Sequence, residues 1–133
     1  MSKLVEELKQ EHVVLVKVLG EIQELGSRSQ ETKDKLSAVK AGLLNHLLKE
    51  DHQLYPSLRK AAESDPRLKT TLDVFAKEMD QISAFALDFF EKYSSESGGI
   101  QFAKDFGSLV ASLSSRIRKE EQILYPEYDK LNP

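Results

Sequence analysis

The stretch HLLKEDHQLYP at residues 46–56 decides the fold, because a related stretch, RIRKEEQILYP, occupies residues 116–126. Both stretches contain an acidic pair followed by Leu-Tyr-Pro, and Glu50 corresponds to Glu120. A histidine opens the first stretch, whereas an arginine opens the second. In both, this first residue and the glutamate are four positions apart, which places the two side chains on one helix face, one turn apart. We therefore interpret the chain as two related halves.

Helical periodicity extends outward from these stretches, and no segment shows the alternation typical of a strand. We predict helices over residues 2–25, 31–63, 66–93 and 100–131. Gly26 is a stop signal, Asp65 and Pro66 are an N-cap and a first helical residue, and SSESGG at 94–99 ends the third helix. The short connections favour antiparallel neighbours. The predicted fold is all-α, an antiparallel up-down-up-down four-helix bundle that forms a single domain over residues 1–133.

Pro56 and Pro126 fall inside two of the predicted helices. A proline removes a helical hydrogen bond and clashes with the preceding turn. Since both prolines end the repeated motif, we predict a shared kink. The preceding Tyr55 and Tyr125 are candidates for hydrogen bonding to a ligand, but core packing is the simpler interpretation. His52 lies opposite the inward face and is predicted to be exposed.

The inward stripe of each helix consists of residues spaced three and four apart, and it is apolar except at mid-helix. On the fourth helix this spacing places Ile123 on the stripe. The middles of antiparallel helices share one layer, so the mid-helix residues should meet at the bundle centre. These residues are His12, His46, Glu50, Met79, Arg116 and Glu120.

Two buried carboxylates, Glu50 and Glu120, require a cation beside them, because an unpaired buried carboxylate would instead take up a proton. The cation is either a metal ion or Arg116. In the first interpretation His12, His46 and Glu50 hold one metal ion, and Glu120 or water completes the shell. Two histidines and a carboxylate suit iron(II), zinc or manganese.

In the second interpretation the centre contains no metal. The guanidinium of Arg116 donates charge-assisted hydrogen bonds to both Glu50 and Glu120, and the two histidines hydrogen-bond to the same network. The sequence leaves both interpretations open. The complete ligand set of the first half favours the metal interpretation.

The composition excludes several classes of function. A net charge of −3 with interspersed lysines does not resemble a nucleic-acid-binding face. The absence of cysteine excludes disulfides and thiolate metal sites. No apolar run has membrane-spanning length and the N-terminal residues are charged, so we predict a cytoplasmic protein without membrane contact. No nucleophile motif or phosphate loop is present, so we predict no enzymatic activity.

The chain resembles the hemerythrin family along its whole length, in the bacterial branch with an HHE cation-binding domain. The resemblance is carried by Glu11-His12, by HLLKEDHQLYP at 46–56 and by KEEQILYP at 119–126. It implies an antiparallel four-helix bundle whose centre typically binds two irons through histidines and two carboxylates. Family members carry or sense dioxygen, store or sense iron, or act in nitrosative stress.

Residue by residue, the resemblance implies that His12, His46, Glu50 and Glu120 are metal ligands. Met79 and Arg116 stand where the family has histidines, so the ligands of a second iron are lacking. We therefore expect a degenerate site with at most one ion, iron or alternatively zinc or manganese, in a sensing or binding role rather than oxygen carriage. The alternative is a metal-free structural or regulatory module in which Arg116 replaces the metal. A protein partner or a homodimer is compatible with either function.

Overall fold

The structure, a computed structural model, describes residues 2–25, 30–93 and 99–132, which form helices and, within these ranges, no strand. The predicted all-α bundle is confirmed, and the helix bounds agree with the prediction to within one or two residues. The stop predicted at Gly26 and most of the 94–99 stretch lie outside the described residues. The elements are α1 (Lys3–Leu25), α2 (Gln30–Lys49), η1 (Glu50–Leu54), α3 (Tyr55–Ala62), α4 (Pro66–Lys92), α5 (Gly99–Lys119), η2 (Glu120–Leu124) and α6 (Tyr125–Leu131).

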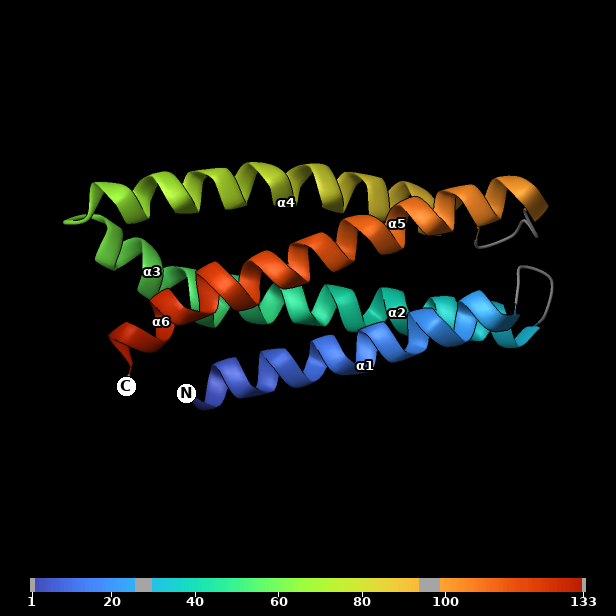
Figure 1. Cartoon of the computed structure of the whole chain (residues 1–133), viewed down its shortest axis with the longest axis horizontal. Helices are drawn as coiled ribbons and strands as arrows, with labels where there is room; N and C mark the ends of the chain where they lie inside the picture. The colour runs from blue at the N-terminus through green and yellow to red at the C-terminus, as the bar shows by residue number, and fades with distance from the viewer. Residues whose placement is uncertain (1, 26–29, 94–98, 133) are drawn as a thin grey trace.

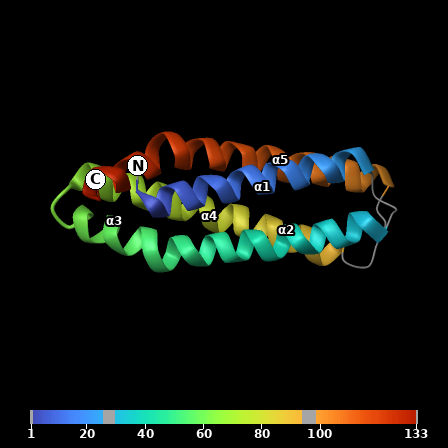
Figure 2. The same cartoon turned by 90° about the horizontal axis from the view of Figure 1, so that it is seen from below.

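The four long helical segments run alternately up and down (Figure 1), as predicted. Seen along the perpendicular direction, α1 and α5 lie toward one side of the bundle and α2 and α4 toward the other (Figure 2). Both chain ends lie at the end of the bundle that carries α3 and α6. In the part of the chain that is described, no helix has both the length and the apolar character needed to cross a bilayer.

The two predicted kinks are wide π-helical turns, η1 and η2, each of five residues. The backbone N–H of Tyr55 donates to the carbonyl of Glu50, five residues earlier, and the N–H of Tyr125 donates to the carbonyl of Glu120 in the same way. Each turn is followed by a proline, which has no N–H to continue the α-helical pattern. The prediction of a shared interruption is therefore confirmed, and its form is a widened turn.

The wide turn also explains an incorrect prediction about the fourth helix. Ile123, which we expected to face inward, is 46% exposed, whereas Leu124 is fully buried. An α-helix has 3.6 residues per turn, but a π turn bonds residues five apart and therefore needs more residues to return to the same face. The residue four positions after Glu120 is consequently the one that points into the core.

The core consists of two apolar clusters on either side of a polar layer. One cluster fills the end of the bundle at which α4 leads to α5, and it includes Leu19, Phe89, Phe102, Phe106 and Leu109. The other fills the end that carries α3 and α6, and it includes Leu8, Leu54, Leu58, Leu72 and Leu124. Between the clusters lie the buried side chains of His12, His46, Glu50, Arg116 and Glu120.

The start of α4 provides a first testable prediction. The side chain of Asp65 accepts a hydrogen bond from the backbone N–H of Leu68 at 3.2 Å, which confirms the predicted N-cap. We expect Asp65→Ala to lower the free energy of unfolding by about 1 kcal/mol, because an amide of the first turn loses its acceptor. Urea denaturation measures the change. The matched control is Asp88→Ala at an exposed position of the same helix, which should not lower stability. Equal effects of the two substitutions would contradict the capping role.

Candidate metal centre

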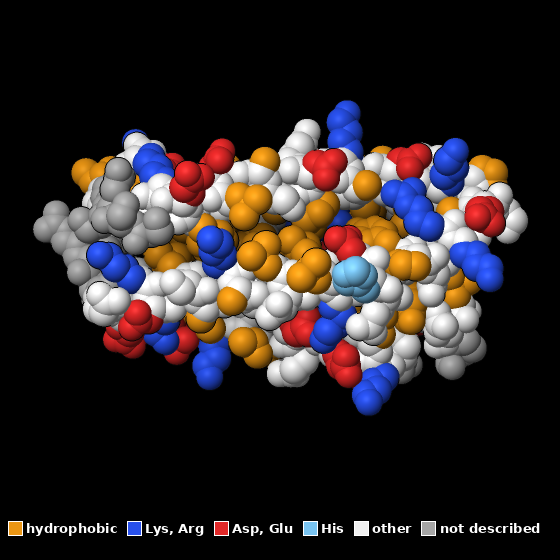
Figure 3. Space-filling view, turned by 180° about the vertical axis from the view of Figure 1, so that it is seen from behind, with side chains coloured by type: hydrophobic (Ala, Val, Ile, Leu, Met, Phe, Trp, Pro, Cys, Tyr) orange, Lys and Arg blue, Asp and Glu red, His pale blue; other side chains and the backbone are white. Residues whose placement is uncertain are grey.

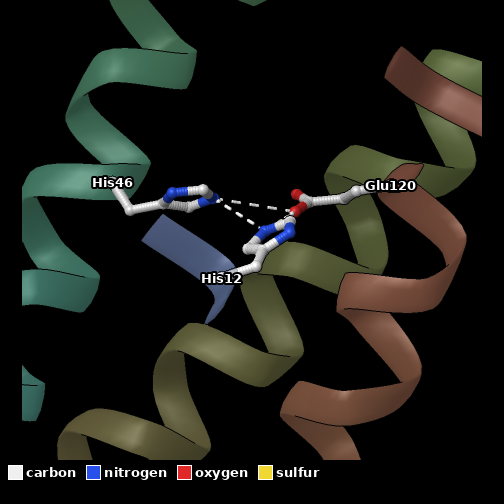
Figure 4. Close-up of side chains that lie close together, drawn as sticks. All are labelled: His12, His46 and Glu120. Atoms are coloured by element: carbon white, nitrogen blue, oxygen red, sulfur yellow. Dashed lines mark hydrogen bonds and ion pairs between the residues drawn. The ribbon is translucent and has the colours of Figure 1, made fainter. Parts of the chain in front are cut away.

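Three buried side chains from three different elements bring one ligand atom each to the bundle centre: His12 from α1, His46 from α2 and Glu120 from η2 (Figure 4). The Nε2 atom of His12 lies 3.1 Å from Nε2 of His46 and 3.0 Å from Oε1 of Glu120. His46 Nε2 lies 3.7 Å from the same oxygen. The three side chains are at most 5% exposed, so the cluster is shielded from bulk water.

The outer ring nitrogens of both histidines are fixed by carboxylates. Nδ1 of His12 lies 2.7 Å from Glu121 Oε2, and Nδ1 of His46 lies 2.7 Å from Glu11 Oε1. A carboxylate accepts hydrogen bonds, so each Nδ1 carries a proton and donates it. Lys49 donates to the other oxygen of Glu11 and holds that carboxylate in place. A histidine that ligates a metal is oriented in this way, with its remaining nitrogen facing the ion.

Glu50 and Tyr125 complete the central group of side chains. The Tyr125 hydroxyl donates to Glu50 Oε2 at 2.8 Å, and its oxygen lies 3.2 Å from Glu120 Oε1. The same oxygen lies 3.3 Å from Nε2 of His12 and 3.5 Å from Nε2 of His46. Glu50 Oε2 is 3.4 Å from Nε2 of His46. Four potential ligand atoms therefore surround one phenol oxygen.

The sequence analysis favoured core packing for Tyr125 over hydrogen bonding to a ligand, and it did not predict the contacts of its hydroxyl with His12, Glu50 and Glu120. Five residues separate it from Glu120, and in an α-helix that spacing turns the two side chains away from each other. The wide η2 turn brings them to one face, where their oxygens meet. The sequence signal for this change of direction is the proline that follows each tyrosine, because it interrupts the regular α-helical rotation.

The centre contains more acceptors than donors when both histidines are neutral. Each Nδ1 proton points outward, so both Nε2 atoms present lone pairs to one another and to the Glu120 carboxylate. The single hydroxyl of Tyr125 makes its shortest contact with Glu50 and cannot satisfy all of them. A further positive charge is needed, and it is supplied either by a proton on a histidine or by a metal ion.

The electrostatics of the metal-free centre show where such a proton resides. For His46, burial opposes protonation, but hydrogen bonds and negative charge from Glu120 and Glu50 outweigh it and raise the pKa to about 10. Burial raises the pKa of Glu50 to about 7. Burial also disfavours the charged form of Glu120, yet hydrogen bonds from both histidines and the charge of Arg116 hold its pKa well below the usual range. In the metal-free centre, protonation is therefore favoured at His46.

Arg116 is buried and uses its guanidinium on three different partners. Nε donates to Glu120 Oε2 at 3.2 Å, one terminal nitrogen donates to the carbonyl of Phe75 at 3.0 Å, and the other donates to the Tyr55 hydroxyl at 2.9 Å. The guanidinium also lies over the Phe75 ring, 4.5 Å from its centroid. Arg116 thus neutralises one oxygen of Glu120 and leaves the other facing the histidines.

This geometry corrects one of our two interpretations. We expected Arg116 to fork between Glu50 and Glu120, but among the described residues no hydrogen bond or ion pair joins it to Glu50. The reason is competition, because a backbone carbonyl and a tyrosine hydroxyl take the two terminal nitrogens. Glu50 is instead held by Tyr125 and lies next to His46.

Met79 lines a small cavity, of about 20 Å³, together with both histidines of the centre. It is partly buried, and its sulfur accepts a hydrogen bond from the Ser83 hydroxyl at 3.3 Å. A wider cavity of about 360 Å³ lies beside the small one, and it is lined in part by Leu47, Met79, Ser83 and Glu50. Leu47, Met79 and Ser83 border both cavities. Figure 3 shows the face of the bundle that carries α2 and α4, and hydrophobic side chains gather along the middle of this face.

The structure brings His12, His46, Glu50 and Glu120 together, and it places His52 at the surface, as we predicted for that histidine. The donor atoms suit a metal ion. A tetrahedral ion with metal–ligand distances of about 2.0–2.1 Å spaces its ligands about 3.3 Å apart. The separations of 3.1, 3.0 and 3.7 Å among the three nearest donors lie around this value.

Comparison with known proteins yields one match. The family model described as the hemerythrin HHE cation binding domain matches residues 3–128 of this chain. No curated protein and no solved structure matches it.

Proposed function

Since the chain belongs to the hemerythrin HHE cation-binding family, we propose that its bundle centre binds a single metal ion, in a sensing or binding role rather than in oxygen carriage. His12, His46 and Glu120 would hold the ion, with Glu50 as a further carboxylate. Iron is the favoured metal, with zinc and manganese as alternatives, because imidazole and carboxylate donors suit all three. A bound iron would add a redox-active Lewis acid to the centre.

The single observation that supports this proposal is the buried cluster in which His12, His46 and Glu120 each bring one ligand atom within 4.8 Å of the others. Two histidines are oriented from outside by Glu121 and Glu11, so that both Nε2 atoms face Glu120 in a buried layer. When both histidines are neutral, their inner nitrogens and the facing Glu120 oxygen are all acceptors. A cation placed among those acceptors satisfies all of them.

The position of Arg116 favours a stoichiometry of one metal ion per chain. Its guanidinium already neutralises the second oxygen of Glu120, and it cannot give up its proton to make room for another cation. Met79, which lines the same small cavity as Arg116, offers a neutral thioether in place of an imidazole and adds no charge to hold a second ion. The half of the centre that contains these two residues is therefore closed to a metal.

A metal-binding experiment tests the proposal. We expect the purified, metal-free protein to bind about one equivalent of iron(II) or zinc, measured by titration calorimetry and by elemental analysis after desalting. His46→Ala should abolish this binding, because it removes one of the two imidazoles. The matched control is His52→Ala, which removes an exposed histidine near the same helix end and should leave the stoichiometry unchanged. Absence of binding, or binding that survives in His46→Ala, would contradict the proposal.

A second candidate function is a metal-free structural or regulatory module. The observation that favours it is that, among the described residues, no buried side-chain nitrogen or oxygen lacks a hydrogen-bond partner even without an ion. The Arg116–Glu120 pair and a protonated His46 then provide the positive charge. The same titration separates the candidates, because this module would bind no metal.

A further inference from the structure

We infer that Tyr125 supplies an additional donor oxygen to the bound ion and that this oxygen biases the site toward iron(III) over zinc. The inference rests on the proposed function, since it concerns the same centre. It adds a ligand outside the histidine and carboxylate set, and it assigns a preference for oxidation state.

The first support is the position of the phenol oxygen. It lies 2.8 Å from Glu50 Oε2, 3.2 Å from Glu120 Oε1, and 3.3 and 3.5 Å from Nε2 of His12 and His46. These separations are those of atoms that share one metal ion, in which neighbouring ligands lie about 3 Å apart. Tyr125 is fully buried, so its hydroxyl is held at this place by the core around it.

The second support is the difference between the two equivalent tyrosines. Tyr55 follows η1 as Tyr125 follows η2, and both lie five residues after the motif glutamate. The hydroxyl of Tyr55 accepts a hydrogen bond from Arg116 and makes no contact with the histidines among the described interactions. Both motif glutamates lie near the histidines, but of the two tyrosines it is Tyr125 whose hydroxyl lies within 3.5 Å of both Nε2 atoms.

The third support is the charge of the complete donor set. Hard anionic oxygen donors favour hard, highly charged ions, whereas zinc accepts softer donors equally well. On binding iron(III), the Tyr125 oxygen would give up its proton to solvent as it bonds to the ion, without any change of oxidation state. The phenolate would add a third anionic oxygen donor to the carboxylates of Glu50 and Glu120, and a set of hard anionic donors favours iron(III) as the harder ion.

The alternative role for Tyr125 is positioning alone, in which its hydroxyl only donates to Glu50. The two roles differ in one spectroscopic property. A phenolate bound to iron(III) gives a visible charge-transfer absorption band, whereas a phenol that only donates a hydrogen bond gives none. The test can therefore use absorbance rather than activity.

The experiment titrates the metal-free full chain with iron(III), added as its nitrilotriacetate complex, and in parallel with zinc. We expect the wild-type protein to bind one equivalent of each and to develop the visible band with iron(III). Tyr125→Phe should still bind one equivalent of zinc, which also shows that it folds, but it should lose the band and bind iron(III) at least about tenfold more weakly. The matched control, Tyr55→Phe, should keep the band.

Each other outcome overturns a defined claim. If the wild-type protein binds zinc but shows no band with iron(III), or if the band persists in Tyr125→Phe, the role of Tyr125 is wrong while the proposed function stands. If the wild type and Tyr125→Phe bind iron(III) with equal affinity, the role of Tyr125 is likewise wrong and the proposed function stands. If the wild type binds neither metal, both the proposed function and the role of Tyr125 are wrong.

Discussion

Arg116→Met is expected to lower the free energy of unfolding of the metal-free protein by about 3–5 kcal/mol, because it strands a buried carboxylate. The substitution leaves Glu120 Oε2, the Phe75 carbonyl and the Tyr55 hydroxyl without their donor. Methionine retains the length of the apolar stem, so lost packing contributes little. Urea denaturation with and without a divalent ion measures the effect. Part of the loss should be restored by the ion, which takes over the neutralising role.

The matched control for this prediction is Arg59→Met. Arg59 makes an ion pair with Asp73 at 3.1 Å, but both side chains are largely exposed, at 44% and 59%. An exposed pair of this kind contributes at most about 1 kcal/mol. If Arg116→Met were no more destabilising than Arg59→Met, the guanidinium would not be the cation that balances Glu120.

The double substitution Met79→His with Arg116→His is expected to raise the metal stoichiometry from one equivalent to two. Both side chains line the small cavity beside the centre, and removal of the guanidinium frees Glu120 Oε2 as a ligand. The two new imidazoles and that oxygen form a second set of donors suited to iron or zinc. Elemental analysis and zinc titration of the desalted protein measure the count.

The single variant Met79→His is the control for the double one. It keeps Arg116 and therefore should still bind one equivalent, because the guanidinium continues to repel a second cation. A stoichiometry of one in the double variant would show that the second half of the chain is not a former ligand set. Such a result would leave the one-ion proposal unaffected.

Regular spacing allowed the fold and the polar layer to be predicted from the sequence. The four-residue separation of His46 and Glu50 fixes a common helix face in any α-helix, and His12 falls at the matching height of its own helix. These inferences need only a constant rotation per residue. For that reason Glu120, which begins η2, is also placed correctly.

The details that the sequence did not predict depend on irregular backbone and on long side chains. Tyr125 reaches the histidines, and Ile123 turns to solvent, because the rotation per residue changes after Glu120. Arg116 has a flexible stem and five donors, so its partners depend on acceptors contributed by α4 and α3, such as the Phe75 carbonyl. Spacing within one helix contains no information about those neighbours.

The polar layer between the two apolar clusters also has a consequence for how the helices align lengthwise. Interchangeable leucines would permit one helix to slide along its neighbours by a turn, about 5.4 Å, with little loss of contact. Here such a slip would set His12 or Glu120 against aliphatic side chains and break each of their hydrogen bonds. The charged layer thus specifies a single register of the helices along the bundle axis.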